Sequence, residues 1–135
     1  MALLTWSKKY SVEVESIDKQ HQKLFDMINE LHDAMRAGKG SVLAPEIVKR
    51  LAAYTREHFA DEESKMKLAH YPDFASHKAV HDKLIGEVAA LAKDIRDGKT
   101  VITMDLQEFL QDWLKTHIAE RDRKYSACLQ AAGIR

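Results

Sequence analysis

Hydrophobic residues recur along most of this chain at intervals of three and four positions, the spacing of an amphipathic α-helix. Glycine and proline residues interrupt the pattern and divide it into four long segments. The predicted helices cover residues 18–37, 45–68, 73–97 and 104–121. Residues 1–17 lack the helical period and are predicted to form an extended N-terminal arm.

Helices of about 20 residues are roughly 30 Å long, and short connections make consecutive helices pack antiparallel. We therefore predict an all-α fold, an up-down-up-down antiparallel four-helix bundle in one domain, with a C-terminal segment over residues 122–135. Asp18 is the predicted N-cap of the first helix, and Pro45 is predicted in the first turn of the second. Gly86 lies inside the third pattern, where glycine costs about 1 kcal/mol relative to alanine but can permit close packing.

The composition narrows the possible functions. The chain has 135 residues, and its 21 Lys plus Arg balance its 21 Asp plus Glu, which argues against a nucleic-acid-binding protein. The single cysteine, Cys128, excludes an internal disulfide and an all-cysteine metal site. Since no segment resembles a signal peptide or a membrane span, we expect a cytoplasmic protein, and we expect it to be monomeric.

Six polar residues occupy positions on the apolar helix faces. They are His21, His58, Glu62, His77, His81 and His117. Two pairs among them are four residues apart, so each pair projects from one face of its helix. A buried imidazole or carboxylate without a partner costs several kcal/mol, and buried charges are normally paired or bound to metal. A shared metal site would explain all six residues together.

Asp122 adds a second carboxylate if the last helix loosens or ends after His117, because five residues on a regular helix turn by about 140°. Five imidazoles and two carboxylates are too many for one ion and suit two ions bridged by both carboxylates. This ligand chemistry suits iron, zinc or copper. Around two six-coordinate irons, these ligands and a bridging oxo or hydroxo group would leave one position open. One open position on a redox-active pair suits a small diatomic molecule.

The ligand pattern resembles the hemerythrins, in particular the bacterial single-domain members. The segments that carry the resemblance are His21, His58-x-x-x-Glu62, His77-x-x-x-His81 and His117-x-x-x-x-Asp122, together with Trp6, Asp18-Lys-Gln-His21 and Trp113-Leu-Lys-Thr-His117. It implies two iron ions with an oxo or hydroxo bridge, and dioxygen as the ligand. His77, His81 and His117 would bind the saturated iron, His21 and His58 the iron with the vacancy, and Glu62 and Asp122 would bridge. Trp113, Leu114 and Ile118 would wall an apolar oxygen pocket.

These inferences favour a non-enzymatic protein that binds dioxygen reversibly for storage, delivery or sensing, with an unidentified oxygen-consuming enzyme as a possible recipient. A di-iron oxidase or peroxidase is the alternative enzyme. Such sites are rich in carboxylates and use Glu-x-x-His pairs, which the helical faces of this chain lack. Iron or nitric oxide handling and a structural zinc bundle also remain open.

The remaining polar and aromatic residues are assigned ordinary roles. We predict His32 and His70 at the surface, and Asp61 and Glu63 as solvated charges beside Glu62. We predict core packing for Trp6, Tyr54, Phe25, Phe59 and Phe109, and a free small side chain for Cys128.

Overall fold

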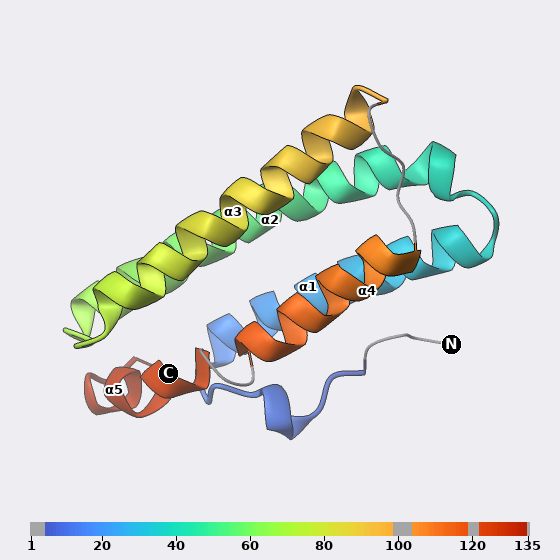
Figure 1. The fold of residues 1–135 in the computed structure, drawn as a ribbon. Helices are drawn as coiled ribbons and strands as arrows, with labels where there is room; N and C mark the ends of the chain where they lie inside the picture. Colours follow the sequence, from blue (N-terminus) through green and yellow to red (C-terminus); the bar gives the residue numbers. More distant parts are fainter. Residues whose placement is uncertain (1–4, 99–103, 119–121, 135) are drawn as a thin grey trace.

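The computed structural model describes residues 5–98, 104–118 and 122–134, and all regular elements within these ranges are helical (Figure 1). In chain order they are η1 Lys8–Tyr10, α1 Glu15–Arg36, α2 Gly40–Leu68, α3 Phe74–Arg96, α4 Met104–Thr116, η3 Asp122–Tyr125 and α5 Ser126–Ala131.

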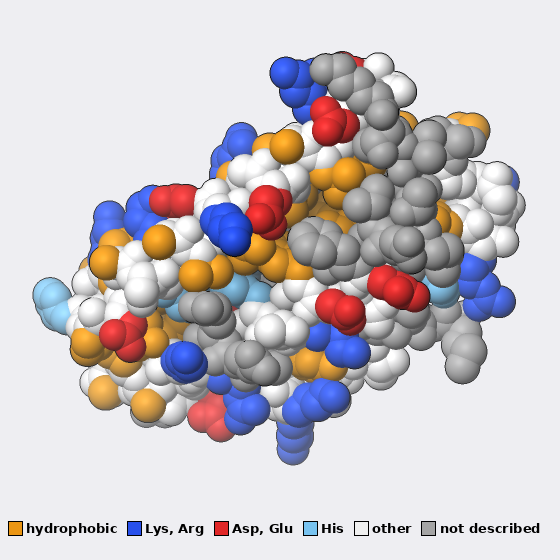
Figure 2. All heavy atoms as spheres, viewed as in Figure 1, with side chains coloured by type: hydrophobic (Ala, Val, Ile, Leu, Met, Phe, Trp, Pro, Cys, Tyr) orange, Lys and Arg blue, Asp and Glu red, His pale blue; other side chains and the backbone are white. Residues whose placement is uncertain are grey.

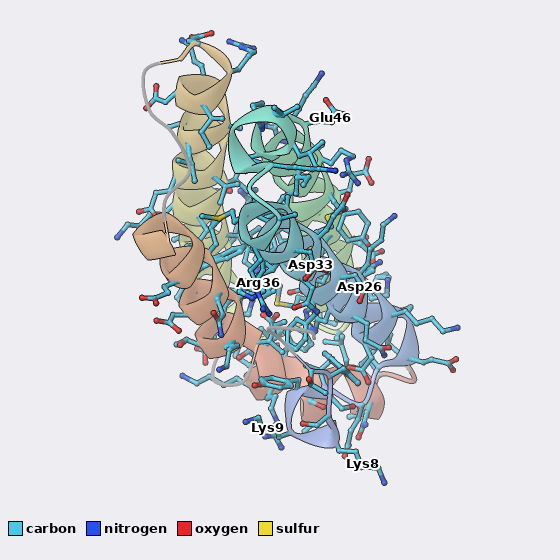
Figure 3. The ribbon with its side chains drawn as sticks, turned by 90° about the vertical axis from the view of Figure 1, so that its right-hand side faces the viewer. Lys8, Lys9, Asp26, Asp33, Arg36 and Glu46 are labelled. Carbon is cyan, nitrogen blue, oxygen red and sulfur yellow. The ribbon has the colours of Figure 1, made fainter. Side chains whose placement is uncertain are left out.

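The four long helices form the predicted bundle. α2 packs against α3 and against α1, and α1 packs against α4, so that two antiparallel pairs face each other (Figure 1). The all-α, up-down-up-down prediction is confirmed. The polar face of α1 points to solvent, where Asp26, Asp33 and Arg36 are exposed (Figure 3). None of the described helices is long and apolar enough to cross a bilayer.

The N-terminal arm is shorter than predicted and contains the single turn η1. α1 already begins at Glu15, since the Asp18 amide bonds the Val14 carbonyl at 2.9 Å, and Asp18 therefore lies inside the first turn and does not cap the helix. Its two carboxylate oxygens accept hydrogen bonds from the Ser11 hydroxyl at 2.6 Å and the Val12 amide at 2.8 Å. Asp18 therefore ties the arm to the first turn of α1.

Two other helix ends differ from the predicted ones. α2 begins at Gly40, five residues before Pro45, since the Leu43 amide already bonds the Lys39 carbonyl and Ala44 is buried. α4 ends at Thr116, and His117 and Ile118 continue in a wider π-type turn. Residues 119–121, where the predicted helix ended, lie outside the described residues. The loosening needed to bring Asp122 toward the other ligands is present.

The hydrophobic core has two parts. The larger, which we call the central core, lies between the helices and includes Leu24, Leu51 and Leu114. The smaller, which we call the end core, joins the arm and α5 to the bundle. Its members are Val12, Val14, Ile17, Met66, Tyr125 and Leu129. Along α1, His21 lies between the two cores, so the polar residues occupy a layer sealed by hydrophobic packing on both sides.

Gly86 does not serve close packing, because a Cβ there would meet no heavy atom of the described residues within 4 Å. Replacing it by alanine should raise the free energy of unfolding by about 0.5–1 kcal/mol. Gly38 is the matched control, since its φ of +72° strains any other side chain and Gly38→Ala should be destabilising. Urea unfolding of the two variants measures both effects, and a destabilised Gly86→Ala variant would contradict the prediction.

Candidate metal centre

All seven predicted ligands meet inside the bundle, each at most 5% exposed. α1 contributes His21, α2 His58 and Glu62, and α3 His77 and His81, while His117 and Asp122 follow α4. Their ligand atoms form two overlapping groups, in each of which all atoms lie within 4.8 Å of one another. One group contains three histidines and the other contains two, and both groups contain Glu62 and Asp122.

The carboxylate of Glu62 divides its oxygens between the two groups. Oε1 lies 3.1 Å from Nε2 of His21 and in close contact with Nε2 of His58. Oε2 lies 3.9 Å from Nε2 of His77 and 3.6 Å from Nε2 of His81. Each oxygen of Glu62 therefore faces a different set of histidines.

Asp122, which follows α4, also divides its two carboxylate oxygens between the two groups. Its Oδ2 lies 3.0 Å from Nε2 of His21, whereas its Oδ1 lies 3.1 Å from Nε2 of His77 and 3.0 Å from Nε2 of His117. Two carboxylates that each present one oxygen to each histidine set have the arrangement of a pair of bridging ligands.

Several atoms at this centre are buried without a hydrogen-bond partner among the described residues. They are Nε2 of His58 and His77, Oε2 of Glu62, and both carboxylate oxygens of Asp122. Buried polar atoms are normally satisfied, and leaving several together unpaired is costly. Metal ions bound by these atoms would satisfy them, so the residues present fit a metal centre.

Comparison with known proteins agrees with this geometry. The model of the hemerythrin HHE cation-binding domain matches residues 12–129. The chain belongs to the hemerythrin family. Bacteriohemerythrin from Methylococcus capsulatus is 40% identical over 97% of this chain and 100% of its own length. The Stenotrophomonas maltophilia bacteriohemerythrin is 34% identical over 97% of this chain and 84% of its own length.

Solved hemerythrin structures have the same fold. The crystal structure of wild-type hemerythrin superposes with a TM-score of 0.88, at 40% identity, over 95% of this chain and 98% of that one. Family membership and the clustered His, Glu and Asp ligands together support a di-iron, oxygen-binding protein, as the resemblance to the hemerythrins implied.

The charges in this hemerythrin's centre are strongly coupled. Burial alone would favour the neutral form of His21, but its close contacts with the carboxylates of Asp122 and Glu62 outweigh burial and raise the pKa of His21 to about 9. Burial and the Asp122 charge oppose ionisation of Glu62, yet contacts with His58 and His21 lower its pKa to about 2. Without metal, the centre holds ionised carboxylates against at least one protonated imidazole.

His81 behaves differently from His21. Burial, which Glu62 only partly offsets, lowers its pKa to about 3, so its ring is neutral at physiological pH. Phe59 stacks on this ring with 3.7 Å between ring centroids and 4° between planes. Phe59 thus packs in the core as predicted, and it also fixes the plane of a ligand.

Four residues around the ligands were missed or misassigned by sequence reasoning. Glu63 accepts a hydrogen bond from Nδ1 of His81 at 3.0 Å, and Asp61 accepts one from Gln20 at 3.0 Å. Both acids are half-buried, so the prediction of solvated charges was wrong. Tyr125 is fully buried in the end core, and burial together with Glu62 and Asp122 raises its phenol pKa well above its usual value.

The residues predicted to wall the oxygen pocket flank His117 in sequence, on α4 and in the turn that follows it. Leu114 and Ile118 are buried in the central core, and Trp113 is half-buried. Trp113 and His117 line an open surface hollow of about 430 Å³ between α3 and α4, with Val80 and Leu84 opposite. Leu114 and Ile118 are not among its lining residues. Figure 2 shows hydrophobic side chains on the face of the molecule between α3 and α4.

Other minor predictions had mixed outcomes. His70 is exposed as predicted, but His32 is half-buried. Phe25 is in the core, and Trp6 packs on it with 5.4 Å between centroids. The side chain of Phe109 lies outside the described residues.

Proposed function

We propose that this hemerythrin holds two iron ions joined by an oxo or hydroxo bridge and binds dioxygen reversibly at one open position, for storage, delivery or sensing. His77, His81 and His117 would hold one iron, and His21 and His58 the other. The observation that carries the proposal is that Glu62 and Asp122 each turn one oxygen toward each histidine set. The iron pair would supply the electrons that dioxygen takes up on binding.

The number of ligand atoms supports six-coordinate ions. A structural zinc is closed by four ligands, whereas five imidazoles and two carboxylates lie together here in two overlapping groups. This ligand count favours two six-coordinate ions over one tetrahedral structural zinc.

The residues of this chain would position the two iron ions and exclude water from the centre. Neutral imidazoles outnumber the carboxylates, which favours binding over the oxidase and peroxidase chemistry of carboxylate-rich sites. Leu114 and Ile118 provide an apolar surface beside the ligands, where water and anions would otherwise promote one-way oxidation. We infer that the protein binds and releases dioxygen rather than catalysing a reaction, and that an oxygen-consuming enzyme receives the released dioxygen.

Reconstitution with ferrous iron under anaerobic conditions tests the proposal. We expect two irons per chain and an optical spectrum that changes when oxygen is admitted and returns when oxygen is removed, over repeated cycles. A single bound ion, or complete oxidation during the first exposure, would overturn it. Steady turnover of peroxide would instead favour the enzyme alternative.

Replacing Leu114 by alanine should hasten autoxidation of the oxygen-bound centre. The buried side chain, 1% exposed, would leave a cavity next to the ligands that admits water. We expect the autoxidation rate, followed optically in air, to rise by about tenfold, equivalent to about 1.4 kcal/mol in the barrier. Leu129→Ala in the end core is the control for a general loss of packing. Equal rates in wild type and Leu114→Ala would exclude the pocket role.

A further inference from the structure

The ring nitrogens that face away from the centre make contacts that fix two of the ligands. Nδ1 of His58 lies 2.6 Å from Oε1 of Gln20, and Nδ1 of His81 lies 3.0 Å from Oε2 of Glu63. A carbonyl or carboxylate oxygen only accepts hydrogen bonds, so each Nδ1 carries the proton. Each Nε2 then keeps its lone pair toward the centre, as a metal ligand requires.

Gln20 is itself held in one orientation. Its Nε2 donates to Oδ2 of Asp61 at 3.0 Å, and the same oxygen accepts from Nζ of Lys65 at 2.5 Å. The carboxylate oxygen that receives Lys65 can only accept from Gln20, so it faces the amide nitrogen. The amide oxygen of Gln20 is thereby turned toward His58. Gln20 comes from α1, whereas His58, Asp61 and Lys65 come from α2.

The two held histidines differ in the charge of their acceptor. His58 donates to a neutral amide, while His81 donates to a carboxylate. A charged acceptor strengthens the hydrogen bond and makes the imidazole a stronger donor to a metal. His58 and His81 belong to different ligand groups, so the difference distinguishes the two metal positions.

We propose that Lys65, Asp61 and Gln20 form a positioning chain that fixes the tautomer and ring direction of His58. Because the residue of this chain that contacts His58 is the neutral amide of Gln20, the metal position that includes His58 binds its ion more weakly than the other position. Glu63 fixes His81 in the same way, but through a charged carboxylate, and thereby strengthens metal binding at the position that includes His81. This inference rests on the proposed function, because it assumes two ions in the centre.

Titration of the metal-free full chain with Co²⁺, followed by visible absorption, tests the proposal without oxygen chemistry. In wild type we expect two binding steps. Gln20→Ala should weaken the second step about ten- to a hundredfold and leave the first unchanged, and Glu63→Gln should weaken the first and spare the second. The Nδ1–H proton signal of His58, shifted by bound Co²⁺, should disappear into exchange with water in Gln20→Ala.

A double variant tests the role of charge. Gln20→Glu combined with Asp61→Asn keeps the number of hydrogen-bonding groups and the net charge, but moves the carboxylate next to His58. We expect this pair to bind the second Co²⁺ more tightly than wild type. Asp26→Asn, an exposed acid on α1, is the neutral control.

The outcomes separate the two claims. Two steps in wild type that Gln20→Ala does not alter, or that Gln20→Ala and Glu63→Gln weaken equally, would overturn the positioning chain. If the double variant binds the second Co²⁺ no more tightly than wild type does, the proposed role of charge is wrong. A wild type that binds only one Co²⁺ would instead contradict the proposed two-ion centre.

Discussion

Replacing Glu62 by alanine should abolish binding of at least one of the two metal ions. The variant removes an oxygen from each ligand group at once and leaves Nε2 of His21 and of His58 without their shared carboxylate partner. Loss of a bridging ligand costs far more than loss of a residue outside the coordination shell, which typically weakens binding by about ten- to a hundredfold. Metal analysis of the reconstituted protein should give at most one iron per chain.

The apoprotein of Glu62→Ala should nevertheless fold. A buried carboxylate and its burial cost are removed together, although His21 loses a partner that helps to keep it protonated. Glu57→Ala, an exposed glutamate on the same helix, is the matched control and should retain two irons. A Glu62→Ala variant with two irons and unchanged oxygen binding would refute the bridging assignment.

The ligands could be predicted from the sequence because they are polar residues at helix positions that normally carry hydrophobic ones. An imidazole or carboxylate at a core position of an amphipathic helix needs a special partner, and the i,i+4 spacing placed His77 with His81 and His58 with Glu62. Asp122 lay off this pattern, and the structure accommodates it by ending α4 at Thr116. Here the departure from regular helix serves the geometry of the centre.

The residues that hold the ligands could not be found in the same way. Gln20, Asp61 and Glu63 lie next to ligands in sequence and off the apolar faces, where polar residues are ordinary. Their contacts cross between helices: Gln20 on α1 meets Asp61 on α2, and Glu63 on α2 meets His81 on α3. Such contacts depend on the distance and rotation of packed helices, which hydrophobic periodicity does not specify.

The apparent affinity for metal should rise steeply with pH, and the stability of the apoprotein should change in the opposite direction. In the apoprotein, His21 keeps a proton up to a pKa of about 9, compared with 6.5 when unfolded. A metal ion must displace this proton to reach the ring nitrogen. Each displaced proton makes the affinity change about tenfold per pH unit, so between pH 6.5 and 8.5 we expect a rise of about a hundredfold.

The stability of the apoprotein follows from the same raised pKa. The contribution of His21 is fully present below pH 6.5 and is lost as the pH rises through about 9, so the melting temperature of the apoprotein should fall over this interval. Glu62, with a pKa of about 2, stays ionised throughout and does not contribute to this change. Buffered Co²⁺ titrations and thermal melts at pH 6.5, 7.5 and 8.5 measure both trends, and His21→Gln should flatten both. Affinity and apoprotein stability that rise together with pH would show that His21 is not the competing proton carrier.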